Sequence, residues 1–233
     1  MIGIALAISF WGVLALIFSP IFGNGRNGLT YADDMFNTLS KGSSYFIPEL
    51  QKNSGKFKGQ TLSVKISAAK AEDKPGDTEA RIQNISKVLT AAGARIEVTG
   101  TDLKIEGDLG AILTSALQDS DAMYKNQGES IKTKYGVDDE KMIFRQWYNA
   151  FTPIDKALKK EGKIEQAKMI SDVGKKAIET AYNYYKVEAV QVKDKAVLMT
   201  ALLVFYVIYT MWWGFAIYFL FDGVGLSMSK AKH

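Results

Sequence analysis

The chain of 233 residues has no cysteine and a single histidine, His233, its last residue. Without cysteine there is no disulfide, no thiolate nucleophile, and no cysteine-ligated zinc, iron–sulfur or c-type haem site. One terminal histidine also argues against imidazole acid–base chemistry and histidine-based metal sites. These absences favour a protein that is not an enzyme, with no catalytic residue, no metal ligand and no cofactor.

Charge is missing from both ends of the chain. Residues 1–25 and 196–221 contain no Asp, Glu, Lys or Arg, so that 51 of the 54 charged residues lie in 26–195. A crossing of the bilayer needs about 20 apolar residues. We therefore predict transmembrane helices at 1–22 and 196–221. The first run lacks the basic start and the cleavage site of a signal peptide, which favours an uncleaved anchor.

The short polar tail, residues 222–233, indicates the orientation of these two spans. It carries Lys230 and Lys232, and basic residues close to a span favour the cytoplasmic side. We expect an integral protein of the inner or cytoplasmic membrane, with both termini cytoplasmic and an extracytoplasmic domain. The partners expected are the lipid bilayer and membrane subunits. Acidic and basic residues alternate and the net charge is only +4, so no nucleic-acid partner is expected.

Small residues recur along the first span at helical spacing. With about 100° between successive residues they share one stripe, and small side chains let helices approach closely within a membrane. The stripe predicts a packing or oligomerisation face, against either the second span or a neighbouring subunit. Its members are Ala5, Ser9, Gly12, Ala15 and Ser19.

The second span is rich in aromatic residues and ends at Asp222. Lipid contact and helix packing are the main interpretation of the aromatic residues, and a quinone or lipid pocket is the alternative. Asp222 is a possible membrane-embedded acidic group, against the simpler interpretation of a solvated residue at the interface. In a channel made by several chains, either Asp222 or the pair Thr200 and Thr210 would line the pore.

Residues 57–127 have the most interpretable pattern of the middle segment. Leu62, Val64 and Ile66 alternate with polar residues, which is typical of a half-buried strand. A helix that starts at Asp77 or Thr78 and stops at Gly93, a hairpin, and a helix that starts at Asp108 follow. The predicted order is β-α-β-β-α, in which two helices cover one face of a three-stranded sheet.

This order, together with the helix ending Ala91-Ala92-Gly93-Ala94 before a hairpin, resembles the ring-building modules of secretion-system and flagellar base rings. The resemblance covers residues 57–127. It implies that copies stack sideways into rings, and therefore that the chain is a homo-oligomer. It carries over no binding residue, because no family-specific motif is present.

Helices are expected on both sides of this module. Residues 23–56 are predicted to be a linker with juxtamembrane helices, divided or ended at Pro48. Residues 128–195 are predicted to be helical, with Thr152 and Pro153 starting a new helix. From Lys163 the helical spacing allows one helix through residue 221, with a break near 193–195 as the alternative. The fold class is thus an α+β membrane protein, with two transmembrane helices flanking an extramembrane domain of a small β-α-β-β-α module plus long helices.

Three short motifs are interpreted as structural. The string Gly23 to Gly28 matches G-x-G-x-x-G but follows an expected membrane helix, so we interpret it as a linker. Ser67 to Lys70 matches S-x-x-K without the partner motifs of penicillin-recognising enzymes. The acidic residues 138–140 stand at a predicted helix start, where capping is a simpler role than cation binding.

These observations lead to three functional hypotheses. The first is a non-enzymatic membrane scaffold that self-associates, with a ring as one form of the assembly, or an accessory subunit of a larger membrane assembly. The second is an extracytoplasmic sensor or ligand-binding module that signals through a partner. The third is a multi-chain channel.

Overall fold

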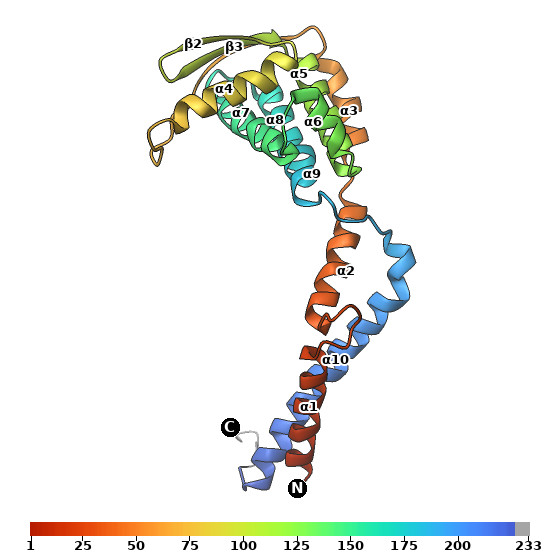
Figure 1. Cartoon of the computed structure of the whole chain (residues 1–233). Coiled ribbons are helices and arrows are strands. Elements are labelled where there is room, and N and C mark those ends of the chain that lie inside the picture. The colour runs from red at the N-terminus through yellow and green to blue at the C-terminus, as the bar shows by residue number, and fades with distance from the viewer. Residues whose placement is uncertain (227–233) are drawn as a thin grey trace. The chain divides into compact units, whose positions relative to one another are not determined.

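A computed structural model of the chain describes residues 1–226, and Lys230, Lys232 and His233 lie outside the described residues (Figure 1). The described chain forms two compact units. The helix-pair unit comprises residues 1–43 together with the chain from Glu188 onward, and the α/β unit comprises Ser44–Val187. The mixed helical and strand content agrees with the predicted class.

The helix-pair unit contains α1 (Ile2–Phe18), α2 (Gly28–Ser43) and α10 (Val192–Gly223). Among the described helices, α10 is the one both long and apolar enough to cross a membrane, with 32 residues, or about 48 Å. The 17 residues of α1 cover only about 26 Å. Pro20 holds Ser19 in an extended conformation, which ends α1. The predicted crossing at 1–22 is therefore not confirmed, whereas that at 196–221 lies within α10.

The glycine-rich segment after α1 is a linker, as predicted. Gly23, Asn24 and Gly25 all have positive φ angles, which glycine and asparagine tolerate best. No strand precedes this segment in the described chain, so the dinucleotide-binding context is absent there.

The α/β unit has the predicted β-α-β-β-α order. The sheet consists of β1 (Thr61–Ser67), β2 (Arg95–Thr99) and β3 (Asp102–Asp108), with α4 (Asp77–Ala91) after β1 and α5 (Leu109–Tyr124) after β3. Its strand order is β1-β3-β2 and both pairings are antiparallel. On one face of the sheet, the alternating apolar residues of β1 and β3 are buried; the other face carries ion pairs such as Lys104–Glu106 at 2.8 Å.

The remaining helices of the α/β unit complete its core. They are α3 (Ile47–Ser54), the 3₁₀ turn η1 (Gly55–Phe57), α6 (Gly128–Tyr135), α7 (Glu140–Lys160), α8 (Ile164–Val173), the π-helix η2 (Gly174–Glu179) and α9 (Thr180–Asn183). Pro48 lies in the first turn of α3, in agreement with the predicted division at that residue. The face of the sheet is shared by α4 and α7, which contact β2 and β1. A helix from outside the predicted module therefore covers part of the sheet.

Two predicted helix boundaries are wrong. Pro153 lies inside α7, which runs without interruption through Thr152. The continuous helix from Lys163 to residue 221 does not form either. The chain leaves helical geometry between Asn183 and Val192, where Lys186 has a φ of +66°. This break precedes the alternative position at 193–195.

The entry and exit segments of the α/β unit bond to the same turn at the end of α5. Near the entry, the Tyr45 hydroxyl donates to Asp121 at 2.5 Å, and its ring lies 4.9 Å from that of Tyr124. Near the exit, the amide N–H of Lys186 donates to the side-chain oxygen of Asn126 at 2.8 Å. We name residues 121–126 the α5 clasp.

Candidate functional site

The helices α1 and α10 pack against each other through Gly3 and Phe10. A Cβ on Gly3 would lie 2.6 Å from the backbone nitrogen of Leu220, so the two backbones touch there. Seven residues later, the Phe10 ring stacks on Tyr209 at 4.3 Å and lies 4.5 Å from Trp213. A glycine contact at one end and an aromatic cluster further along therefore hold the pair together. Neither Gly3 nor Phe10 was predicted from the sequence as a packing residue. Gly3 is small, like the residues of the predicted stripe, but it lies on the other side of α1.

The predicted small-residue stripe does not face α10. Ala5, Ser9, Gly12 and Ala15 are exposed and Ser19 is half-buried, whereas the buried residues Gly3 and Phe10 lie roughly opposite on the helix. A Cβ on Gly12 would meet nothing within 4 Å. The Ser9 hydroxyl donates to the carbonyl of Ala5 at 2.9 Å, so its proton is already used within the helix. Of the two packing partners considered, only a neighbouring subunit remains as a prediction for this stripe.

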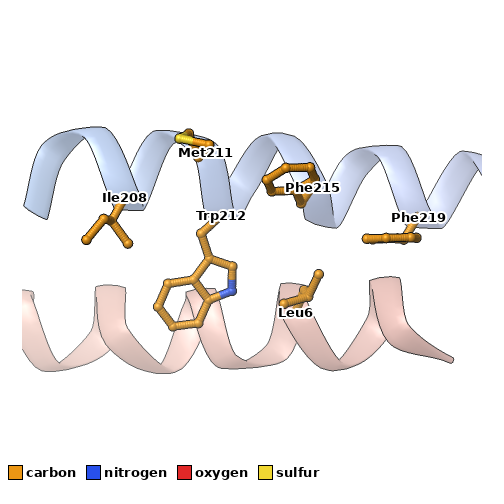
Figure 2. Close-up of a pocket in the computed structure, with 6 residues that line it drawn as sticks. All are labelled: Leu6, Ile208, Met211, Trp212, Phe215 and Phe219. Carbon is orange, nitrogen blue, oxygen red and sulfur yellow. The ribbon is translucent and has the colours of Figure 1, made fainter.

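A groove of about 550 Å³ lies between α1 and α10 (Figure 2). All its lining side chains are apolar or aromatic, and the indole ring of Trp212 stands across from Leu6. The indole nitrogen of Trp212 is buried without a hydrogen-bond partner in the described chain. The lining residues are Leu6, Ile208, Met211, Trp212, Phe215 and Phe219.

The polar residues of α10 do not form a buried site. Asp222 is exposed in the last turn of the helix. Thr200 and Thr210 donate to the carbonyls of Ala196 and Tyr206, each at 2.9 Å, so their hydroxyl protons are used within α10.

The α/β unit contains one buried carboxylate that the sequence analysis missed. Asp119 on α5 accepts hydrogen bonds from the Tyr135 hydroxyl at 2.5 Å and the Trp147 indole N–H at 3.0 Å, and the Lys134 ammonium lies at 2.6 Å. Burial, with Asp119 alongside, raises the pKa of Tyr135 well above its usual range. The signal was an aspartate among the apolar residues of a helix face, next to Ala116 and Met123. Because its donors come from α6 and α7, Asp119 links these two helices to α5.

Of the acidic residues 138–140, Asp139 caps a helix, as predicted for this group. The side chain of Asp139 accepts the amide N–H of Lys141 at 2.9 Å at the start of α7. Glu140 is buried, and a hydrogen bond from Tyr185 lowers its pKa. The S-x-x-K residues Ser67 and Lys70 end a strand and enter a loop; the Lys70 ammonium lies 3.4 Å from the side-chain oxygen of Asn149.

Comparisons with known proteins add no functional information, so the proposed function is argued from the residues of the chain itself. No family model matches the chain, and no match was found among the curated proteins or the solved structures.

Proposed function

We propose that the chain is a non-enzymatic membrane scaffold, which is anchored by α10 with α1 packed on it and self-associates through the free stripe of α1. The observation that carries this proposal is the exposure of Ala5, Ser9, Gly12 and Ala15 on the side of α1 that α10 leaves uncovered. Interfaces between membrane helices favour small residues, because they let backbones come close. A stripe used by α10 would leave no such surface for a second copy.

The apolar surface of the helix pair supports the membrane anchor. In α10 only Ala216 is buried, and the exposed side chains include Val197, Leu203 and Tyr206. Such a surface is stable in lipid, where the helix satisfies its own backbone groups, and would aggregate in water. The proposed topology keeps both termini in the cytoplasm and the α/β unit outside it.

The association is tested by native mass measurement of the purified chain in mild detergent. The proposal expects a defined oligomer that Gly12→Leu converts to smaller species, since a large side chain would hold the α1 stripes apart. Gly214→Leu is the matched control, because a Cβ on Gly214 also meets nothing within 4 Å. A wild-type monomer that recruits no partner, or dissociation by Gly214→Leu alone, contradicts the proposal.

The topology is tested separately with single cysteines, which the cysteine-free chain makes unambiguous. A cysteine at Lys65, on the exposed face of the sheet, should react with a membrane-impermeant thiol reagent added to intact cells. A cysteine in the tail at Ser227 should react only after the cells are opened. The reverse pattern would invert the proposed orientation.

A further inference from the structure

Two cavities adjoin each other between α7 and the segment formed by α8, η2 and α9. The smaller has a volume of about 140 Å³ and the larger about 290 Å³. Tyr148 and Glu179 line both of them. All the residues that line the two cavities belong to the α/β unit. Together they form one site, which we name the α7 cavity.

Both walls of the α7 cavity depart from regular α-helix. Pro153 in α7 has no N–H, so the carbonyl of Asn149, which lines the larger cavity, lacks its usual helical donor. On the other wall, η2 is a six-residue π-helix, an irregularity that often marks functional sites. The α7 cavity thus lies between a helix with an internal proline and a π-helix that contacts it.

Most of the polar side chains that line the smaller cavity have no partner among the described residues. Lys175 and Glu179 form no ion pair with any described residue, and no described residue bonds to the hydroxyls of Thr152 or Ser171. Asp155 uses one carboxylate oxygen to pair with Lys159 at 2.7 Å, and the other, Oδ1, is buried without a partner in the described chain. A buried acceptor without a donor is costly. The carboxylates can therefore accept hydrogen bonds from a bound molecule, and the hydroxyls and the ammonium group can donate hydrogen bonds to it.

The larger cavity differs in chemistry. Phe144, Tyr148, Ile178 and Tyr182 contribute apolar and aromatic surface to its lining. Arg145 is the one cationic residue in its lining, and its guanidinium donates a hydrogen bond to the hydroxyl of Tyr182 at 3.1 Å. The site thus has a polar chamber with two carboxylates beside a mainly aromatic chamber.

We propose that the α7 cavity binds a small molecule with a primary ammonium group on an aromatic or apolar body. The ammonium lies in the smaller cavity, where Asp155 Oδ1 and Glu179 accept its hydrogen bonds and the Thr152 and Ser171 hydroxyls complete its shell. The body lies in the larger cavity against Tyr148. Free amines and amino acids share this chemistry; an amino acid would also place its carboxylate near Lys175.

The test measures binding of three probes to the full chain in detergent micelles by titration calorimetry. The probes are phenethylamine, phenylalanine and 3-phenylpropionate, of which the last lacks an ammonium group. The proposal expects saturable binding of at least one of the first two and none of the third. If Lys175 holds a carboxylate, phenylalanine binds more tightly than phenethylamine, and Lys175→Gln removes that advantage.

The variant Glu179→Gln should weaken binding of the ammonium probes about tenfold or more, because it removes a charged acceptor. Glu179 is exposed, so this change should leave thermal unfolding as in the wild type. Asp155→Asn should act in the same direction. Glu165→Gln on α8 is the matched control, since its side chain is 85% exposed and lines neither cavity. Equal binding of 3-phenylpropionate, absence of saturation by both ammonium probes, or wild-type affinity in Glu179→Gln overturns the proposal.

Discussion

Leu62, Leu103 and Trp147 of the α/β unit are wholly buried, whereas Val197, Leu203 and Tyr206 of α10 expose 65–86% of their surface. The α/β unit buries its apolar side chains and exposes a charged face of its sheet. The helix pair shows its apolar side chains to its surroundings. The first unit is therefore stabilised by water through the hydrophobic effect. In the proposed function, lipid and other copies of the chain cover the apolar surface of the second unit.

The largest effect should come from removing the central aromatic residue of the α/β unit. Trp147→Ala leaves a cavity and deprives Asp119 of one donor, so unfolding should become easier by about 3–5 kcal/mol. The measurement is denaturant unfolding followed by circular dichroism. Tyr148→Ala, next to it but half exposed, should change stability by about 0.5 kcal/mol or less. Equal effects of the two changes would mean that the buried core does not determine the stability of this unit.

A charge at the centre of α10 should have the next largest effect. Val207 is 52% exposed, and an aspartate there would cost about 2.5–3.5 kcal/mol on insertion into a bilayer. Val207→Asp should therefore reduce the fraction of the chain that resists alkaline extraction from membranes. Val207→Leu is the control and should behave as the wild type. Full retention of Val207→Asp would contradict the contrast between the two units.

A methyl group added to α1 should weaken its pairing with α10 on one side of the helix and not on the other. The Cβ of Gly3→Ala would collide with the backbone of α10, and that of Gly12→Ala would meet nothing within 4 Å. Gly3→Ala should weaken the α1–α10 pairing by about 1–3 kcal/mol, and Gly12→Ala should not weaken it. Distances between spin labels on cysteines introduced at Ile8 and Ile217 would report the pairing. A larger loss with Gly12→Ala would place α10 on the stripe instead.

The smallest effect concerns acid stability of the α/β unit. Hydrogen bonds from Arg81 and Thr78 lower the pKa of Asp73 well below its usual range. The charged carboxylate therefore stabilises the folded unit above the unfolded pKa of about 3.9, and this contribution is lost as the pH falls toward the folded pKa. Asp73→Asn should unfold with a shallower dependence on pH below about 4 than the wild type. Glu165→Gln should keep the wild-type dependence of stability on pH. If Asp73→Asn also keeps it, the Arg81–Asp73 pair is not the cause of the acid sensitivity.

The order of the sheet module could be predicted because its signals are local. Alternation in β1, the positive φ of Gly93 and the cap at Asp108 all lie within a few residues of the features they determine. The interior position of Pro153 could not be predicted in this way. There α7 is held between β1 and α8, and tertiary packing outweighs the local tendency of proline to start a helix.

The candidate site was only partly predictable for a related reason. The small residues of α1 could be identified by their spacing, but spacing does not say which face meets α10. That choice depends on the contact of Gly3 with Leu220 and of Phe10 with Tyr209, which are over 190 residues apart. The α7 cavity likewise brings together residues of α7 and η2 that share no motif.

The α5 clasp has a consequence for protein engineering. A unit whose first and last segments meet at one turn can be inserted between two consecutive positions of another chain without pulling that chain apart. Ser44–Val187 has this form, since Tyr45 and Lys186 both bond within residues 121–126. The α/β unit therefore has the chain geometry that transfer into a loop of another protein requires.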